Sequence, residues 1–174
     1  FQCQQTAGNV ACQGRAGVCG KKADTANFQD ELTGALIGLA RSVINKKSTK
    51  KSDELMLKGL FTAVTNVNFN SETVKALTKE VEAEKEAIDP SAENYDIEKI
   101  WNDNEDIRSL KSLILFGLRG MAAYGYHAYC LGYESKEVNE FFYEGMYALG
   151  EDWGADKLLP VVLKTGEINF KCMV

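Results

Sequence analysis

Apolar residues recur three and four positions apart along most of the chain, which is the spacing of a helical face that packs against a neighbour. The two clearest series are Leu32, Leu36, Leu39 and Val43, and Leu110, Ile114, Leu118 and Met121. Strand-like alternation is scarce, and both prolines, Pro90 and Pro160, lie outside these series. The pattern predicts an all-α protein with helices near residues 24–45, 53–67, 71–87, 104–132, 135–149 and 155–165.

Polar residues stand at the predicted helix starts. Ser52, Asn70 or Ser71, and Ser135 can each offer a side-chain oxygen to the free backbone amides of the turn that follows. The clearest break between helices is the segment 89–94, which begins Asp-Pro-Ser. This break divides the chain into two halves.

The two halves resemble each other. Residues 36–39 return as residues 115–118, and residues 58–61 return as residues 144–147. Each segment has a glycine within an apolar helical face, where the missing side chain lets a neighbouring helix come close. Short connections make consecutive helices antiparallel neighbours. We therefore expect two antiparallel three-helix bundles related by an internal repeat. The expected order is a cysteine-rich loop over 1–23, a first bundle over 24–89, a linker over 90–103 and a second bundle over 104–174.

Composition and charge are those of an ordinary globular domain. Hydrophobic residues make up 45% and charged residues 26% of the 174 residues, enough to bury one good core or two small ones. A net charge of -5 argues against a nucleic-acid partner, and the one basic cluster, within residues 46–51, is typical of a solvated connection. No apolar run is long enough to cross a bilayer, and the first residues are too polar for a signal peptide. We expect a cytoplasmic protein without nucleic-acid or membrane partners.

Three of the five cysteines, Cys3, Cys12 and Cys19, lie close together at the start of the chain, in a stretch rich in glycine and polar residues. Glycines let the backbone bend, so that several sulfur atoms can converge on one centre. Thiolates are soft ligands that favour iron-sulfur clusters, zinc or copper(I). An iron-sulfur cluster normally takes four cysteines, and only three are present locally. The residues favour an iron-sulfur site with these three cysteines as metal ligands.

Other interpretations of the cysteines stay open. A disulfide scaffold is disfavoured because five cysteines are an odd number and sparse for this chain length. A zinc site would lack the Cys-x-x-Cys knuckle of common zinc motifs. His127 and Cys130 lie three apart on a predicted helix, where packing roles are commoner than metal binding. The alternative to a redox domain is a helical interaction or scaffold domain whose cysteine loop binds zinc or no metal.

Short segments along nearly the whole chain match one family pattern. They are FQCQQTA (1–7), Cys12, GVCGK (17–21), NFQDEL (27–32), NEDIRSLK (104–111), GLRGMAAY (117–124) and KTG (164–166). Together they resemble the amino-terminal domain of hybrid cluster proteins, the prismane or hydroxylamine reductase family. The amino-terminal motif of that family opens Cys-x-x-Cys, and its first cysteine would fall immediately before Phe1.

The resemblance implies a helical domain with two such bundles and an iron-sulfur cluster bound by Cys3, Cys12, Cys19 and the preceding cysteine. A four-iron four-sulfur cluster (4Fe-4S) is favoured, and a two-iron form (2Fe-2S) is the alternative. The cluster would relay electrons from a donor protein, which the sequence does not identify, to a hybrid iron-sulfur-oxygen cluster. That second cluster is expected in later α/β domains, the partners of this domain, where the family converts hydroxylamine to ammonia and water. We predict no catalytic residue in this chain and no reductase activity from it alone.

Overall fold

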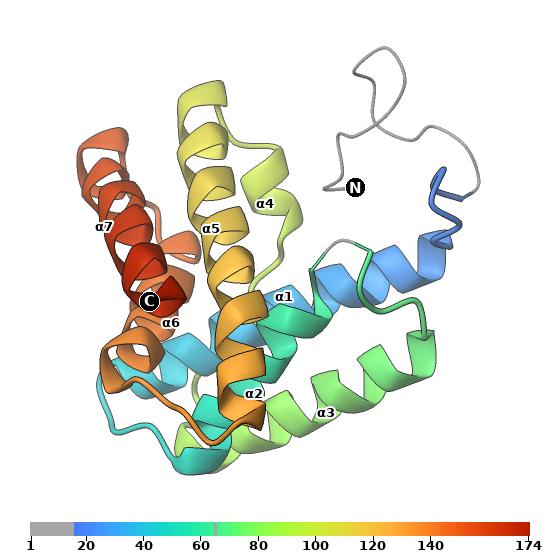
Figure 1. Cartoon of the computed structure of the whole chain (residues 1–174). Coiled ribbons are helices and arrows are strands. Elements are labelled where there is room, and N and C mark those ends of the chain that lie inside the picture. Colours follow the sequence, from blue (N-terminus) through green and yellow to red (C-terminus); the bar gives the residue numbers. More distant parts are fainter. Residues whose placement is uncertain (1–15, 65) are drawn as a thin grey trace.

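The computed structural model describes residues 16–64 and 66–174, and these residues form seven helices (Figure 1). Their order is α1 (Ala23–Ile44), α2 (Lys50–Thr62), α3 (Ser71–Ile88), α4 (Glu98–Trp101), α5 (Glu105–Cys130), α6 (Lys136–Leu149) and α7 (Ala155–Met173). Within the described residues, the strand-like pairing is limited to one bridge between Ala16 and Lys22. The predicted all-α class is confirmed. None of the described helices is both long enough and apolar enough to span a membrane.

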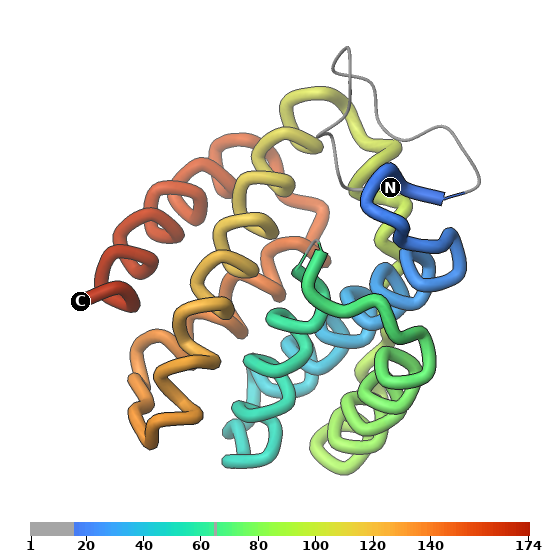
Figure 2. Tube along the Cα trace, turned by 45° about the vertical axis from the view of Figure 1, so that its right-hand side comes forward, coloured from blue at the N-terminus to red at the C-terminus, as the bar shows by residue number. Residues whose placement is uncertain are grey.

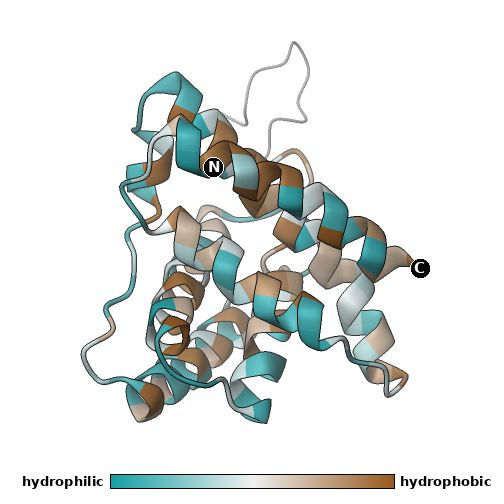
Figure 3. Cartoon of the chain, turned by 90° about the vertical axis from the view of Figure 1, so that its left-hand side faces the viewer, coloured by the Kyte–Doolittle hydropathy of each residue, from teal (hydrophilic) through white to brown (hydrophobic). Residues whose placement is uncertain are grey.

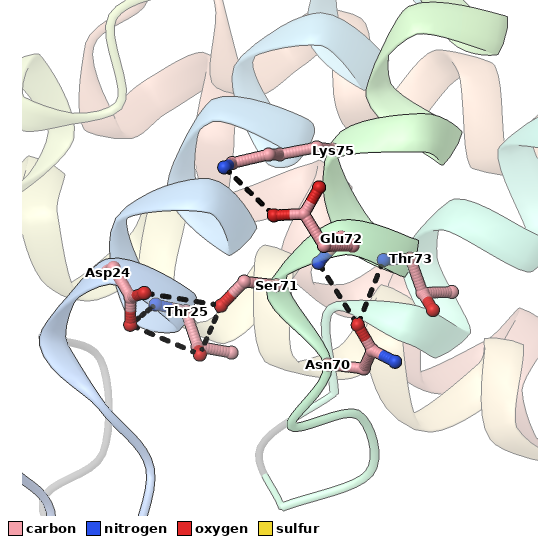
Figure 4. Close-up of polar contacts among 7 residues, drawn as sticks. All are labelled: Asp24, Thr25, Asn70, Ser71, Glu72, Thr73 and Lys75. Atoms are coloured by element: carbon pink, nitrogen blue, oxygen red, sulfur yellow. Dashed lines mark hydrogen bonds and ion pairs between the residues drawn. The ribbon is translucent and has the colours of Figure 1, made fainter.

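Side-chain caps begin α3 and α6 as the sequence predicts. Asn70 accepts hydrogen bonds from the backbone amides of Glu72 and Thr73, and Figure 4 shows this cap. The hydroxyl of Ser135 accepts one from the amide of Val138 at the start of α6.

The predicted cap of α2 is wrong. Helix α2 begins at Lys50, and its cap is Thr49, whose Oγ1 accepts a hydrogen bond from the amide of Ser52 at 2.9 Å. The Ser52 hydroxyl in turn accepts one from the amide of Thr49 at 2.9 Å. Ser52 therefore lies inside the first turn, as the third helical residue, where its hydroxyl completes the reciprocal capping box with Thr49.

Helix α2 also ends at Thr62, before the predicted end at residue 67, and two further features differ from the predicted pattern. Helix α7 continues past Gly166 to Met173, beyond the predicted end at residue 165. It continues because Thr165 and Ile168, one turn apart, are both buried against the core. The short helix α4, which the pattern does not predict, lies within the linker and buries Ile100.

The three helices of the first half alternate in direction. The hydroxyls of Thr25 and Ser71 are 2.8 Å apart where α1 and α3 begin (Figure 4). At the far ends of the same helices, the Lys46 ammonium donates to the Ile88 carbonyl at 2.8 Å. Helices α1 and α3 therefore run parallel and pack together, and α2 runs in the opposite direction and packs against both.

The second half has the same arrangement. Thr165 and Cys172 of α7 lie against Gly117 and Gly125 of α5, so these helices run parallel and side by side (Figure 2). Helix α6 runs the other way, because the Lys171 ammonium pairs at 2.7 Å with a glutamate in the first turn of α6. Buried side chains of both halves form one hydrophobic cluster. The predicted boundaries of two separate bundles stay a prediction.

Contacts between the halves join α1 to α6 and α2 to α5. Arg119 of α5 is buried and donates to the hydroxyl of Thr33 on α1 at 2.8 Å. Burial lowers the pKa of Arg119 to about 10, and the carboxylate of Asp30 opposes that shift, so the guanidinium is charged at neutral pH. The hydroxyl of Tyr143 on α6 bonds to the first turn of α2, and burial raises the pKa of this tyrosine.

Glycines allow close packing at all four positions of the predicted repeat, although one neighbour is not a helix. Gly59 and Gly145 each lie against a leucine of the preceding helix, and Gly117 lies against α7. Gly38 instead lies against linker residues 93–94. The expectation that a helix packs against Gly38 is wrong, because the linker crosses α1 at the positions where the side chains of α1 are smallest.

Candidate metal centre

Cys19 lies on the surface, in a short hairpin that comes just before α1. The bridge between Ala16 and Lys22 closes this hairpin, and the amide of Gly17 donates to the Lys21 carbonyl at 2.8 Å. The amide of Gly20 donates to the Gly17 carbonyl at 2.9 Å, which forms the turn. Gly20 has φ +88°, a conformation that glycine adopts without steric cost. We call residues 16–22 the cysteine hairpin.

Cys3 and Cys12, the other two predicted ligands, lie outside the described residues. Their meeting with Cys19 therefore stays a prediction. Among residues 16–64 and 66–174, no group of three or more cysteine, histidine or acidic side chains is placed to hold a metal ion.

The remaining cysteines have surroundings of other kinds. Cys130 is exposed at the end of α5. Cys172 is half-buried, its thiol lies 3.6 Å from the Met121 carbonyl, and burial raises its pKa. His127 makes an edge contact with the ring of Phe61, with 5.7 Å between the ring centroids. His127 is itself exposed, and this ring contact is with an aromatic residue of α2.

The hairpin leads directly into the first turn of α1, and that turn is joined to α3. The hydroxyl contact of Thr25 with Ser71 joins the first turn of α1 to α3, and Asp24 accepts a hydrogen bond from the Thr25 amide at 2.7 Å (Figure 4). The Lys21 ammonium donates to Oε1 of Gln29 at 2.7 Å. The segment that carries Cys19 is therefore connected to α1, both along the chain and through the contact of Lys21 with Gln29.

Gln29 was not singled out by the sequence pattern as a site residue. It lies three positions before Leu32 and so belongs to the inward face of α1, where its exposed fraction is 5%. A polar residue at an apolar position of the helical pattern is the signal that could have found it.

The donor chemistry of the described part fits one ligand of a thiolate-bound metal. The sulfur of Cys19 is exposed at a turn, so it can bind a metal without disturbing the helical core. A thiolate is the ligand that both iron-sulfur clusters and structural zinc prefer. The hairpin alone therefore does not distinguish the two metals.

Comparison with known proteins shows similarity along the whole chain. The family described as the Prismane/CO dehydrogenase family matches residues 1–174. A protein named hydroxylamine reductase from Desulfitobacterium hafniense (strain DSM 10664 / DCB-2) is 33% identical over 205 residues, which cover 99% of this chain and 37% of that protein.

Two other relatives carry the same name. The hydroxylamine reductase of Solidesulfovibrio magneticus is 34% identical over 99% of this chain and 38% of its own length. That of Methanocella arvoryzae is 36% identical over 99% of this chain and 38% of its own length. The chain spans a little over a third of the length of these relatives.

Proposed function

This chain belongs to the prismane/CO dehydrogenase family, and we propose that it forms the amino-terminal domain of a hydroxylamine reductase. The observation that carries the proposal is the family match over residues 1–174, together with relatives of that name. The parent protein would reduce hydroxylamine with electrons and protons to ammonia and water in the cytoplasm. The isolated chain would be inactive, because the catalytic cluster is expected in the rest of the parent protein.

Cys3, Cys12 and Cys19 would hold an iron-sulfur cluster in this domain, with a further cysteine before Phe1 as the fourth ligand. A bound cluster of this type supplies one-electron transfer. The chain's own contribution is positional: the cysteine hairpin presents the Cys19 sulfur outward, and the backbone turn places it beside the start of α1. We propose a four-iron four-sulfur form, with a two-iron two-sulfur form as the alternative, since both forms take four thiolates.

Anaerobic reconstitution with iron and sulfide tests this site. The chain with one cysteine added before Phe1 is compared with the chain as given, by visible and electron paramagnetic resonance spectra and by iron analysis. We expect a stable cluster in the extended chain and a weak or absent one in the chain as given. If neither chain takes up iron and both bind zinc, the scaffold alternative replaces the relay.

Apolar side chains are exposed along one face of α5 and α7. On α7, Leu163 and Phe170 are 68% and 67% exposed. A Cβ added at Gly120 or Gly166, near the middle of each helix, would meet no neighbouring atom. Figure 3 views the molecule from the side of α7. We call this surface the α5–α7 stripe: Leu113, Phe116 and Tyr124 on α5, and Leu159, Leu163 and Phe170 on α7.

The α5–α7 stripe is where the remaining domains of the parent protein would pack. Soluble domains rarely leave a continuous apolar surface uncovered. Relatives have nearly two thirds of their length beyond the region that this chain matches, so enough polypeptide exists to cover it. The stripe also lies away from the cysteine hairpin, so packing there leaves Cys19 accessible to an electron donor (Figures 1 and 2).

A lysine in the α5–α7 stripe is expected to weaken the packing of the remaining domains of the parent protein against this domain. In the full-length protein, Leu163→Lys should raise amide hydrogen exchange along the outer face of α5 and α7 toward the rate of the isolated chain. Glu80→Lys, at an exposed position of α3, is the control and should change nothing. Equal exchange in the parent protein and in the isolated chain would contradict this. If the isolated chain forms a dimer and Leu163→Lys dissociates it, the stripe binds a second copy of this chain instead.

A further inference from the structure

Gln29 makes three hydrogen bonds with its side-chain amide, all to segments outside its own helical turn. Oε1 accepts from the Lys21 ammonium at 2.7 Å. Nε2 donates to the Asn68 carbonyl at 3.0 Å and to the Thr62 carbonyl at 3.4 Å. Both amide protons and the oxygen are therefore used, as a buried amide requires.

The two ends of this amide face different parts of the molecule. Nε2 attaches Gln29 to backbone carbonyls at the end of α2 and in the connection to α3, which belong to the body of the domain. Oε1 accepts a hydrogen bond from the Lys21 ammonium. The Lys21 carbonyl in turn accepts a hydrogen bond from the amide of Gly17 across the cysteine hairpin. The Lys21 ammonium also lies 5.8 Å from the centroid of the Phe69 ring.

We propose that Gln29 is the positioning residue of the cysteine hairpin: it holds Lys21 and thereby sets the place of Cys19 relative to α1. The role of Cys19 as a cluster ligand rests on the proposed function. The proposed attachment of the hairpin is argued from the hydrogen bonds of Gln29 and does not depend on a bound cluster. A ligand that is held in place before the metal arrives loses less freedom on binding, so it keeps the metal longer.

Two substitutions distinguish the role of Oε1, which contacts Lys21, from the role of Nε2, which contacts the two backbone carbonyls. Gln29→Leu replaces the polar amide with an apolar side chain of similar size and removes all three hydrogen bonds. Gln29→Glu keeps an acceptor for Lys21 but sets a carboxylate oxygen against the two backbone carbonyls that Nε2 contacts. Asn27→Leu is the matched control, because Asn27 is exposed on the same turn of α1.

Amide hydrogen exchange of residues 16–22 is the first measurement. A hydrogen bond to a charged group is worth about a tenfold to hundredfold change in such an equilibrium, so Gln29→Leu should speed hairpin exchange by that factor. Gln29→Glu should leave the hairpin close to wild type and should speed exchange only in residues 66–70. Unchanged hairpin exchange in Gln29→Leu, or equal acceleration in both variants, would overturn the proposal.

Iron retention after reconstitution is the second measurement, made in chains that carry the added cysteine before Phe1. Gln29→Leu should lose iron to a chelator about tenfold faster than wild type, and Gln29→Glu should restore the slow rate. Equal rates in all variants would overturn the link between the hairpin and the metal. If wild type binds no cluster, the proposed function fails, and the exchange measurement still decides whether Gln29 holds the hairpin.

Discussion

Cys19→Ser is expected to abolish cluster binding while leaving the helical fold intact. A serine hydroxyl is a hard and protonated donor, so it replaces a thiolate poorly on iron. Loss of a direct ligand should lower metal affinity by at least about 100-fold, the upper end of what the loss of an outer-shell partner costs. The fold should survive because Cys19 is exposed and contributes nothing to the buried cluster of side chains.

The measurement is iron and sulfide content after anaerobic reconstitution of the cysteine-extended chain, with circular dichroism for helix content. Cys130→Ser is the matched control, because Cys130 is also exposed but lies at the end of α5. It should keep the full iron content. A normal iron content in Cys19→Ser, or equal losses in both variants, would remove Cys19 from the ligand set.

Gly34→Ala is expected to produce the largest loss of stability among the glycine substitutions. A Cβ at this position would lie 2.1 Å from the carbonyl oxygen of Tyr95 in the linker. The linker cannot simply move away, because the Tyr95 amide donates to the Gly34 carbonyl at 3.1 Å. The Tyr95 ring is also held, with the Arg41 guanidinium 5.3 Å from its centroid. Overpacking of this kind costs about 1–3 kcal/mol.

Urea unfolding followed by circular dichroism measures this loss. Gly120→Ala is the matched control, because Gly120 lies inside α5 and a Cβ there would meet no neighbouring atom. It should raise the free energy of unfolding by about 0.5–1 kcal/mol, since alanine favours a helix over glycine. If both substitutions stabilise the chain to the same degree, the linker does not cross α1 as described.

The pattern of apolar residues was sufficient to predict the long helices, because helix formation and burial of one face depend on local spacing. Residues such as Leu36 and Leu118 are buried as their spacing predicts. The helix ends were less predictable. Thr49 and Ser52 are both hydroxyl residues, and only the reciprocal hydrogen bonds decide which one caps α2.

The candidate site was predictable only in part. Cys19 could be selected from the sequence because it is one of three cysteines close together in a glycine-rich stretch, and thiolates are good ligands for soft metals. Gln29 can be noticed as a polar residue at an apolar position of the helical pattern, but its hydrogen-bond partners and those of Arg119 cannot be predicted from the sequence. The partners of both residues lie on other segments of the chain, and no local spacing identifies those partners.

The sequence by itself determined the all-helical class, the approximate helices, the cysteine-rich start and the family, because all of these depend on residues close together in the chain. Only the tertiary structure decided that α1 packs on α6 and α2 on α5, that the linker crosses α1 at Gly34, and that Gln29 accepts a hydrogen bond from Lys21 of the cysteine hairpin. These features depend on atoms that are distant in sequence and meet only after the helices have packed, so no spacing along the chain encodes them.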